Sequence, residues 1–94
     1  MRESEKATER YLFNRVKKLG GKAYKFVPMH DGGLPDRVCF LPGGVVFFVE
    51  TKSQGDKPSK LQIIKHRELR ALGFKVFVAD TKKQIDEILN AITR

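Results

Sequence analysis

The chain has one cysteine, no tryptophan and only two histidines among its 94 residues. A lone Cys39 excludes an internal disulfide and a cysteine-rich zinc site, and His30 and His66 are too far apart for a His-x3-His zinc site. No stretch approaches the roughly 20 apolar residues of a membrane span, and the charged N-terminus lacks the apolar segment of a signal peptide. No glycine-rich phosphate loop or nucleophile pattern suggests a nucleotide cofactor or covalent catalysis. These absences predict a soluble, intracellular, cytoplasmic protein.

Positive charge is in excess. The sequence has 19 Lys and Arg against 11 Asp and Glu, a formal net charge of +8. Such a balance favours an anionic partner and steers it toward the protein, with nucleic acid as the leading candidate. The alternative is a basic surface that is merely solvated. A chain of this length predicts a single domain over residues 1–94, with one modest core.

The spacing of apolar residues predicts seven elements in the order αβββαβα. These are helices over 4–19, 59–72 and from Thr81 onward, and strands over 23–27, 36–41, 45–49 and 74–79. The five apolar residues from Val45 to Val49 indicate a strand covered on both faces near the centre of a sheet. Ser59 with Gln62, and Thr81 with Gln84, match the capping box that begins a helix. The order predicts an α/β domain built on one sheet covered by helices.

Acidic and basic side chains gather where the central strand ends. Glu50 and Lys52 are two residues apart on an extended segment, so their side chains leave the same face. If residues 42–44 form a three-residue hairpin loop, Leu41 pairs with Val45 and Asp36 lies opposite Glu50. A two-residue loop would shift the register by one residue and turn Asp36 to the other face.

Opposed carboxylates about 5 Å apart repel each other unless a cation lies between them. Mg²⁺ prefers carboxylate oxygens, and a lysine beside such a pair suits metal-assisted cleavage of phosphodiesters. The alternative is structural: Asp36 caps a turn, and Glu50 and Lys52 form a solvated ion pair. The glycine-rich segment before Pro35-Asp36 and the buried strand that ends at Glu50 favour the site, because open α/β folds place their sites at strand ends.

Three blocks of the sequence together resemble the VRR-NUC nucleases of the PD-(D/E)XK superfamily. They are Gly33-Leu34-Pro35-Asp36-Arg37, Phe47-Phe48-Val49-Glu50-Thr51-Lys52 and Lys57-Pro58-Ser59-Lys60-Leu61-Gln62. The resemblance implies a restriction-endonuclease-like αβββαβ core with a mixed central sheet, here followed by an extra C-terminal helix. It also implies Asp36 and Glu50 as metal ligands, the carbonyl of Thr51 as a further ligand, and Lys52 as the catalytic lysine. The expected ion is Mg²⁺, with Mn²⁺ able to substitute.

The same resemblance extends the expected site to the first helix and the second. In this superfamily an acidic residue of the first helix commonly joins the metal site, and Glu9-Arg10-x-Leu12 resembles the opening of archaeal-type Holliday junction resolvases. We select Glu9, with Glu5 one turn earlier as the reserve, although either could be an ordinary exposed glutamate. Gln62 matches a family glutamine at the edge of the active site, and its capping role is compatible with that position.

We therefore expect a metal-dependent endonuclease that acts on branched or structured DNA, with a Holliday junction resolvase preferred. A flap or nicking nuclease, and a non-catalytic nucleic-acid-binding module, are the alternatives. Small stand-alone members of the family are typically phage or bacterial proteins, so a phage-encoded chain would act in the bacterial host cell. Symmetric cutting of a four-way junction predicts a homodimer, for which the apolar face of the first or last helix would serve. The expected DNA contacts are Lys57, Lys60, Arg37, Lys25 and His30.

Overall fold

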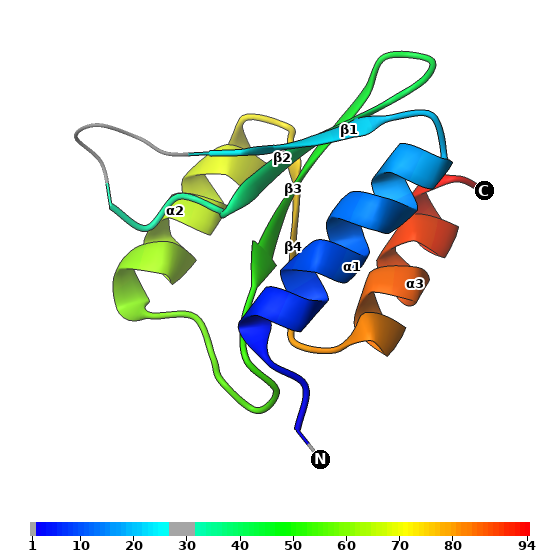
Figure 1. Cartoon of the computed structure of the whole chain (residues 1–94). Coiled ribbons are helices and arrows are strands. Elements are labelled where there is room, and N and C mark those ends of the chain that lie inside the picture. Colours follow the sequence, from blue (N-terminus) through cyan, green and yellow to red (C-terminus); the bar gives the residue numbers. More distant parts are fainter. Residues whose placement is uncertain (1, 27–31) are drawn as a thin grey trace.

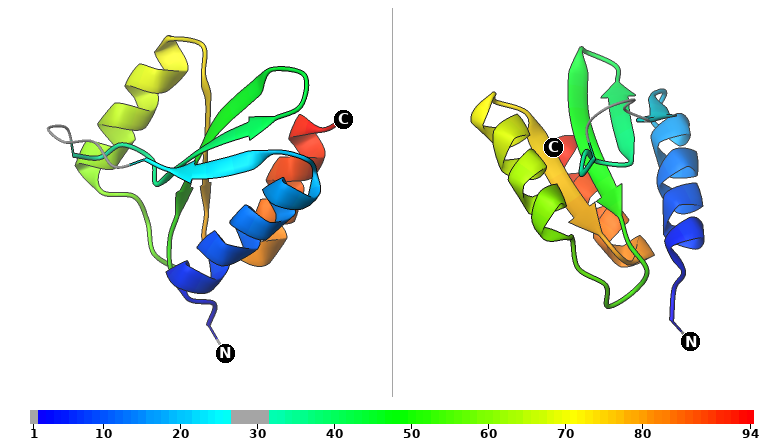
Figure 2. Two further views of the ribbon diagram at one scale, coloured as in Figure 1. Left: turned by 45° about the horizontal axis from the view of Figure 1, so that its top comes forward. Right: turned by 90° about the vertical axis from the view of Figure 1, so that its left-hand side faces the viewer.

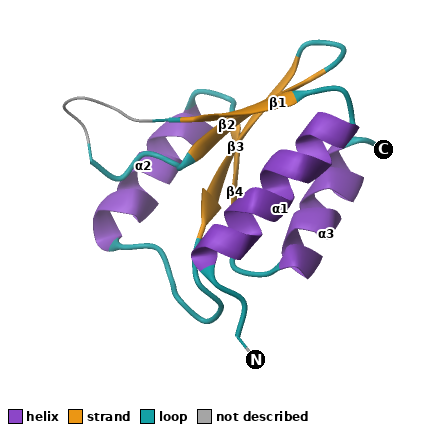
Figure 3. Cartoon of the chain, viewed as in Figure 1, coloured by secondary structure: helices purple, strands orange, loops and turns teal. Residues whose placement is uncertain are grey.

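The computed structural model describes residues 2–26 and 32–94. Its elements are α1 (Glu5–Lys18), β1 (Lys22–Lys25), β2 (Arg37–Leu41), β3 (Val45–Thr51), α2 (Lys60–Ala71), β4 (Lys75–Ala79) and α3 (Lys82–Ile92). The predicted αβββαβα order is confirmed (Figures 1 and 3). The expected end of the first strand, Val27, and the expected DNA contact His30 lie outside the described residues.

The four strands form one mixed sheet in the order β1-β2-β3-β4. β1, β2 and β3 are antiparallel neighbours, whereas β4 runs parallel to β3. Leu41 pairs with Val45, so the loop between β2 and β3 has three residues and the predicted register is confirmed. Gly43 and Gly44 have φ values of +88° and +76°, which other residues rarely adopt, so the tight reversal depends on glycine.

The helices cover opposite faces of the sheet. Figure 2 shows α1 and α3 on one side of the strands and α2 on the other, beside β4. β3 lies between β2 and β4, and its residues from Phe47 to Thr51 are buried, as predicted for a central strand. It extends two residues beyond the predicted end because Glu50 and Thr51 still pair with β4. None of the described helices combines the length and apolar character needed to cross a bilayer.

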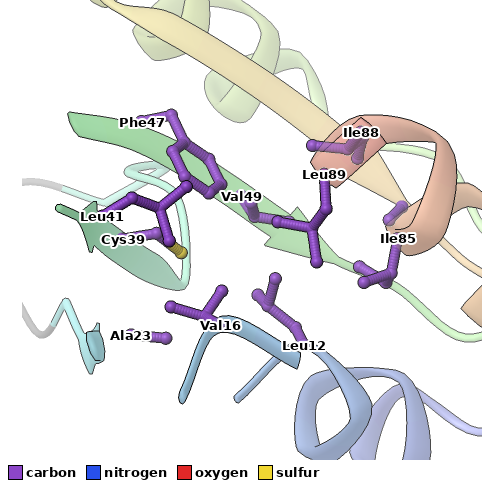
Figure 4. Close-up of a cluster of buried hydrophobic side chains, with 11 residues drawn as sticks. Leu12, Val16, Ala23, Cys39, Leu41, Phe47, Val49, Ile85, Ile88 and Leu89 are labelled. Carbon is purple, nitrogen blue, oxygen red and sulfur yellow. The ribbon is translucent and has the colours of Figure 1, made fainter. Parts of the chain in front are cut away.

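The main core lies between the sheet and the pair α1 and α3 (Figure 4). Leu12 and Val16 of α1 and Ile85 of α3 are fully buried against Phe47 and Val49. Each buried aliphatic or aromatic side chain of this kind contributes about 1.5–3 kcal/mol. The side chains Leu12, Val16 and Ile85 of the first and last helices are thus buried inside the domain. These buried side chains are not available to the expected dimer surface, whereas Phe13 and Leu19 of the first helix region are 42% and 38% exposed, and the homodimer stays a prediction.

The caps differ in detail from the prediction. Ser59 and Gln62 form the complete capping box at the start of α2. At the start of α3, the Thr81 hydroxyl accepts a hydrogen bond from the backbone N–H of Gln84. The Gln84 side chain, however, accepts from the N–H of Asp80 and not from that of Thr81. The second capping box is therefore incomplete, because its glutamine stabilises the preceding residue.

Candidate active site

Asp36 is fixed at the start of β2 by its backbone and by its side chain. Its carbonyl oxygen accepts a hydrogen bond from the N–H of Phe26 (2.7 Å), which extends the ladder between β1 and β2 by one residue. Its Oδ2 accepts from the backbone N–H of Thr51 (2.9 Å) and from the Thr51 hydroxyl (3.0 Å). The preceding Pro35 is fully buried. The end of β3 therefore holds the Asp36 carboxylate in one position.

Glu50 is the most unusual ionisable group of the described chain. Only 1% of its surface is exposed, and its Oε1 has no hydrogen-bond partner. The pKa of Glu50 is raised from 4.5 to about 8. The largest cause is burial, and a hydrogen bond with Asp36 and the negative charge of Asp36 add to it. Burial and the neighbouring carboxylate therefore favour the protonated form of Glu50. Perturbed carboxylates of this kind are typical of functional sites.

Two basic side chains approach the two oxygens of Glu50 from different elements. Lys52 Nζ lies 3.9 Å from Oε2, and His66 Nε2, from α2, lies 3.7 Å from Oε1. His66 is 2% exposed, and its Nε2 also has no hydrogen-bond partner. Burial, with the nearby charges of Arg70 and Lys52, lowers the pKa of His66. Sequence reasoning assigned His66 no role, although its position four residues after Gln62 on a helix puts both on one face.

The donor set suits a hard divalent cation. The two carboxylates act on each other across adjacent strand ends, and the unpaired Oε1 of Glu50 is a buried acceptor without a donor. Within residues 2–26 and 32–94, no group of three or more acidic, cysteine or histidine side chains forms a metal site by itself. Mg²⁺ commonly retains several waters and binds through one or two carboxylates. Asp36 and Glu50 can therefore hold such an ion if a backbone carbonyl and waters complete its shell.

The two candidate glutamates of α1 have different neighbours. Burial and then the charge of Asp36 raise the pKa of Glu5, while the charge of Lys52 lowers it. Glu5 therefore interacts electrostatically with the candidate site. Glu9 forms a salt bridge of 2.6 Å with Arg37. The structure thus brings the reserve residue, Glu5, toward Asp36, and gives the preferred residue, Glu9, another partner.

The expected DNA contacts occupy different surroundings. Lys25, Lys57 and Lys60 are exposed. Arg37 is committed within the chain, since its Nε and Nη2 donate to Glu9 and its Nη1 donates to the carbonyl of Ala23. A hollow of about 530 Å³ lies beside this pair, lined by Lys6, Glu9, Arg10, Phe13, Lys25 and Arg37. Sequence reasoning missed Lys6 and Arg10, although their i, i+4 spacing places both on one helix face.

Gln62 serves the start of α2, where its side chain accepts a hydrogen bond from the N–H of Ser59 (2.8 Å). The loop that carries Asp36 packs against this same turn. Gly33 has a φ of +82°, and a Cβ there would lie 2.8 Å from both Cγ and the carbonyl oxygen of Leu61. A glycine is required for that close approach. The contact places the loop before Asp36 next to the helix that carries Gln62 and His66.

Comparisons with known proteins agree with this geometry. No protein-family model matches the chain. It is 43% identical over 88 residues to a phage protein named "Putative nuclease p44", from Acyrthosiphon pisum secondary endosymbiont phage 1, with 94% of each chain covered. A solved structure described as a VRR_NUC domain superposes with a TM-score of 0.88 at 34% identity, covering 94% of this chain and 96% of that one. The chain therefore belongs to the VRR-NUC nuclease family.

Proposed function

We propose that the protein is a divalent-metal-dependent endonuclease that cuts branched or otherwise structured DNA, with a four-way junction as the preferred substrate. The observation that carries this proposal is the convergence of Asp36, Glu50 and Lys52 at the ends of β2 and β3, in a chain of the VRR-NUC family. A non-catalytic binding module would not require a buried Glu50 carboxylate beside Asp36 and a lysine. The energetic cost of that arrangement favours catalysis.

Asp36 and Glu50 would hold the ion, with the carbonyl of Thr51 as a further ligand and Mg²⁺ or Mn²⁺ as the metal. When bound, the ion supplies Lewis acidity toward the phosphate and lowers the pKa of a bound water. Lys52 lies 3.9 Å from Glu50, so it can orient that water or pair with charge that develops on the phosphate. Thr51 keeps the Asp36 carboxylate in place through its two hydrogen bonds.

The DNA backbone would pass over the basic hollow beside α1. The hollow is lined by Lys6, Arg10 and Lys25. Glu9, which also lines it, lies one helical turn after Glu5. Phosphate contacts fix the register of a duplex without reading its bases. Recognition by backbone contacts favours a nuclease that selects the shape of its substrate over one that selects a sequence. Lys57 and Lys60, near the start of α2, would contact a second part of the substrate.

A homodimer would present two such sites related by a two-fold axis, as symmetric cutting of a junction requires. Leu12 and Val16 of α1 and Ile85 and Leu89 of α3 are buried in the core, whereas Phe13 of α1 is 42% exposed. Exposed apolar side chains are found on β1, β2 and α2, among them Tyr24, Phe40 and Ile64.

The purified protein should be incubated with labelled four-way junctions, flaps and linear duplexes, with Mg²⁺, with Mn²⁺ and with a chelator. We expect symmetric cleavage of the junction that requires the metal. If the protein prefers to cut flaps or to nick linear duplex, it is a flap or nicking nuclease and not a junction resolvase. Binding without cleavage under every metal condition would support the non-catalytic module and overturn the proposed activity.

A further inference from the structure

His66 lies at the base of the candidate site with a buried nitrogen that nothing in the described chain pairs. The residue is 2% exposed, and its Nε2 has no hydrogen-bond partner. The atom facing it, Oε1 of Glu50, is likewise buried and unpartnered, 3.7 Å away. Buried polar atoms in native proteins are nearly always paired, and each exception requires an explanation. Here two exceptions face each other.

The gap between the two atoms is slightly longer than a hydrogen bond. N–H···O bonds have donor–acceptor distances of about 2.7–3.2 Å, so a small rotation of either side chain closes the gap. The other oxygen of Glu50, Oε2, is the one that faces Lys52. Oε2 therefore faces Lys52, whereas Oε1 faces His66 of α2.

We propose that His66 is a positioning residue that donates a hydrogen bond from Nε2 to Oε1 of Glu50 and so orients this carboxylate toward the divalent ion. The role rests on the proposed metal-dependent function. Ligating carboxylates are usually held by such outer hydrogen bonds, and loss of one typically costs 10–100-fold in metal affinity or activity. Both the imidazolium and one neutral tautomer carry a proton on Nε2, so the contact does not require His66 to change charge.

Replacing a histidine with a purely structural role would lower the thermal stability and leave the metal affinity unchanged. Because Nε2 makes no hydrogen bond at its separation of 3.7 Å from Glu50, an apolar side chain of similar size breaks no existing bond and should leave the metal-free fold at least as stable. A positioning residue predicts the opposite sign for metal binding. The combination of unchanged or increased thermal stability with weakened metal affinity is therefore diagnostic of the proposed role.

The test is calorimetric titration of Mn²⁺ into the full chain without DNA, for the wild type, Asp36→Asn, His66→Leu and His66→Gln. Glutamine places an amide N–H close to the position of Nε2, whereas leucine removes the donor. We expect His66→Leu to weaken Mn²⁺ binding about 10–100-fold and His66→Gln to restore it to within about threefold of the wild type. Melting of the variants in chelator should show no loss of stability in His66→Leu. If that variant does not fold, His66→Met provides the same comparison.

The two levels of the hypothesis fail in different ways. If Asp36→Asn weakens Mn²⁺ binding but His66→Leu binds like the wild type, His66 has no positioning role and the metal site stands. If Asp36→Asn binds Mn²⁺ as tightly as the wild type, the ion does not bind at these carboxylates. The proposed metal site then fails, and the role of His66 fails with it.

Discussion

Thr51 donates two hydrogen bonds to a single oxygen of Asp36, one from its backbone N–H at 2.9 Å and one from its hydroxyl at 3.0 Å. Thr51 is fully buried at the end of β3, and Asp36 immediately precedes β2. Both bonds go to Oδ2, so they fix the carboxylate through only one of its two oxygens. One residue thus positions a carboxylate contributed by the neighbouring strand.

Thr51→Val should weaken this arrangement without changing the volume of the buried side chain. The variant retains the backbone N–H but loses the hydroxyl donor, so we expect a loss of about 1–2 kcal/mol in the free energy of unfolding. Mn²⁺ affinity should fall about tenfold because the carboxylate is less well oriented. Urea unfolding and calorimetry measure the two effects. Thr51→Ser, which keeps the hydroxyl, should bind Mn²⁺ nearly normally, and equal defects in both variants would contradict the role of the bond.

Asp36→Asn and Lys52→Ala should each abolish DNA cleavage while leaving DNA binding within about threefold of the wild type. The first change removes the charge of a proposed metal ligand, and the second removes the group proposed to orient the water or stabilise the phosphate. Cleavage of a labelled junction and a gel-shift assay measure the two properties. Lys83→Ala, on the exposed start of α3, is a control with the same loss of charge as Lys52→Ala. Metal-dependent cleavage retained in both site variants would refute the assignment.

Glu5→Gln and Glu9→Gln should separate the two acidic residues of α1. Because Glu5 senses the charge of Asp36, its neutralisation should weaken Mn²⁺ binding by about threefold or more. Glu9→Gln should leave Mn²⁺ binding unchanged but lower the free energy of unfolding by about 1–3 kcal/mol, since Arg37 loses its charged acceptor. The reverse pattern in calorimetry and urea unfolding would return Glu9 to the metal site.

The stability of the protein in chelator should fall as the pH rises. The pKa of Glu50 is raised from 4.5 to about 8 in the folded chain, so the folded state keeps a proton that the unfolded chain releases. Its stabilising contribution is fully present below about pH 4.5 and is lost as the pH rises through about 8. The slope should reach at most about 1.4 kcal/mol per pH unit.

Urea unfolding of wild type and Glu50→Gln across this window, with chelator present, isolates the effect. The free energy of unfolding of the wild type should fall steadily with rising pH relative to that of Glu50→Gln. Other groups around Glu50 also titrate or carry charge: Asp36, Lys52, Glu5 and His66. The lowered pKa of His66 acts with the opposite sign below 6.5, and the comparison of variants largely cancels it. Parallel pH profiles would show that Glu50 ionises normally.

The basic hollow should contribute to the salt dependence of DNA binding. Removing one phosphate-binding side chain should reduce the slope of log affinity against log salt concentration by about 0.9 on duplex DNA. We therefore expect Lys6→Ala and Lys25→Ala each to lower the slope by about that amount, whereas Lys83→Ala on α3 should leave it unchanged. Fluorescence anisotropy over a series of salt concentrations measures this. Identical slopes for all three variants would remove the hollow from the DNA path.

The sequence by itself determined the order of the elements and the central position of β3, and it narrowed the hairpin register to two alternatives. Each follows from local rules: apolar periodicity, capping residues, and a Pro42-Gly43-Gly44 loop whose length fixes which side chains oppose each other. Asp36 lies opposite Glu50 only if this loop has three residues, and the pairing of Leu41 with Val45 in the structure selects that register over the two-residue alternative. The family resemblance followed from the same compact motifs.

Only the tertiary structure decided which helical side chains reach the site. Glu5 and Glu9 lie one turn apart with similar local sequence, and the packing of α1 against β1 and β2 directs Glu9 to Arg37 and Glu5 toward Asp36. His66 reaches Glu50 because α2 packs beside β4, on the face of the sheet to which Glu50 points. Periodicity gives the face of a helix, but its rotation and distance from the sheet depend on contacts between residues far apart in the chain.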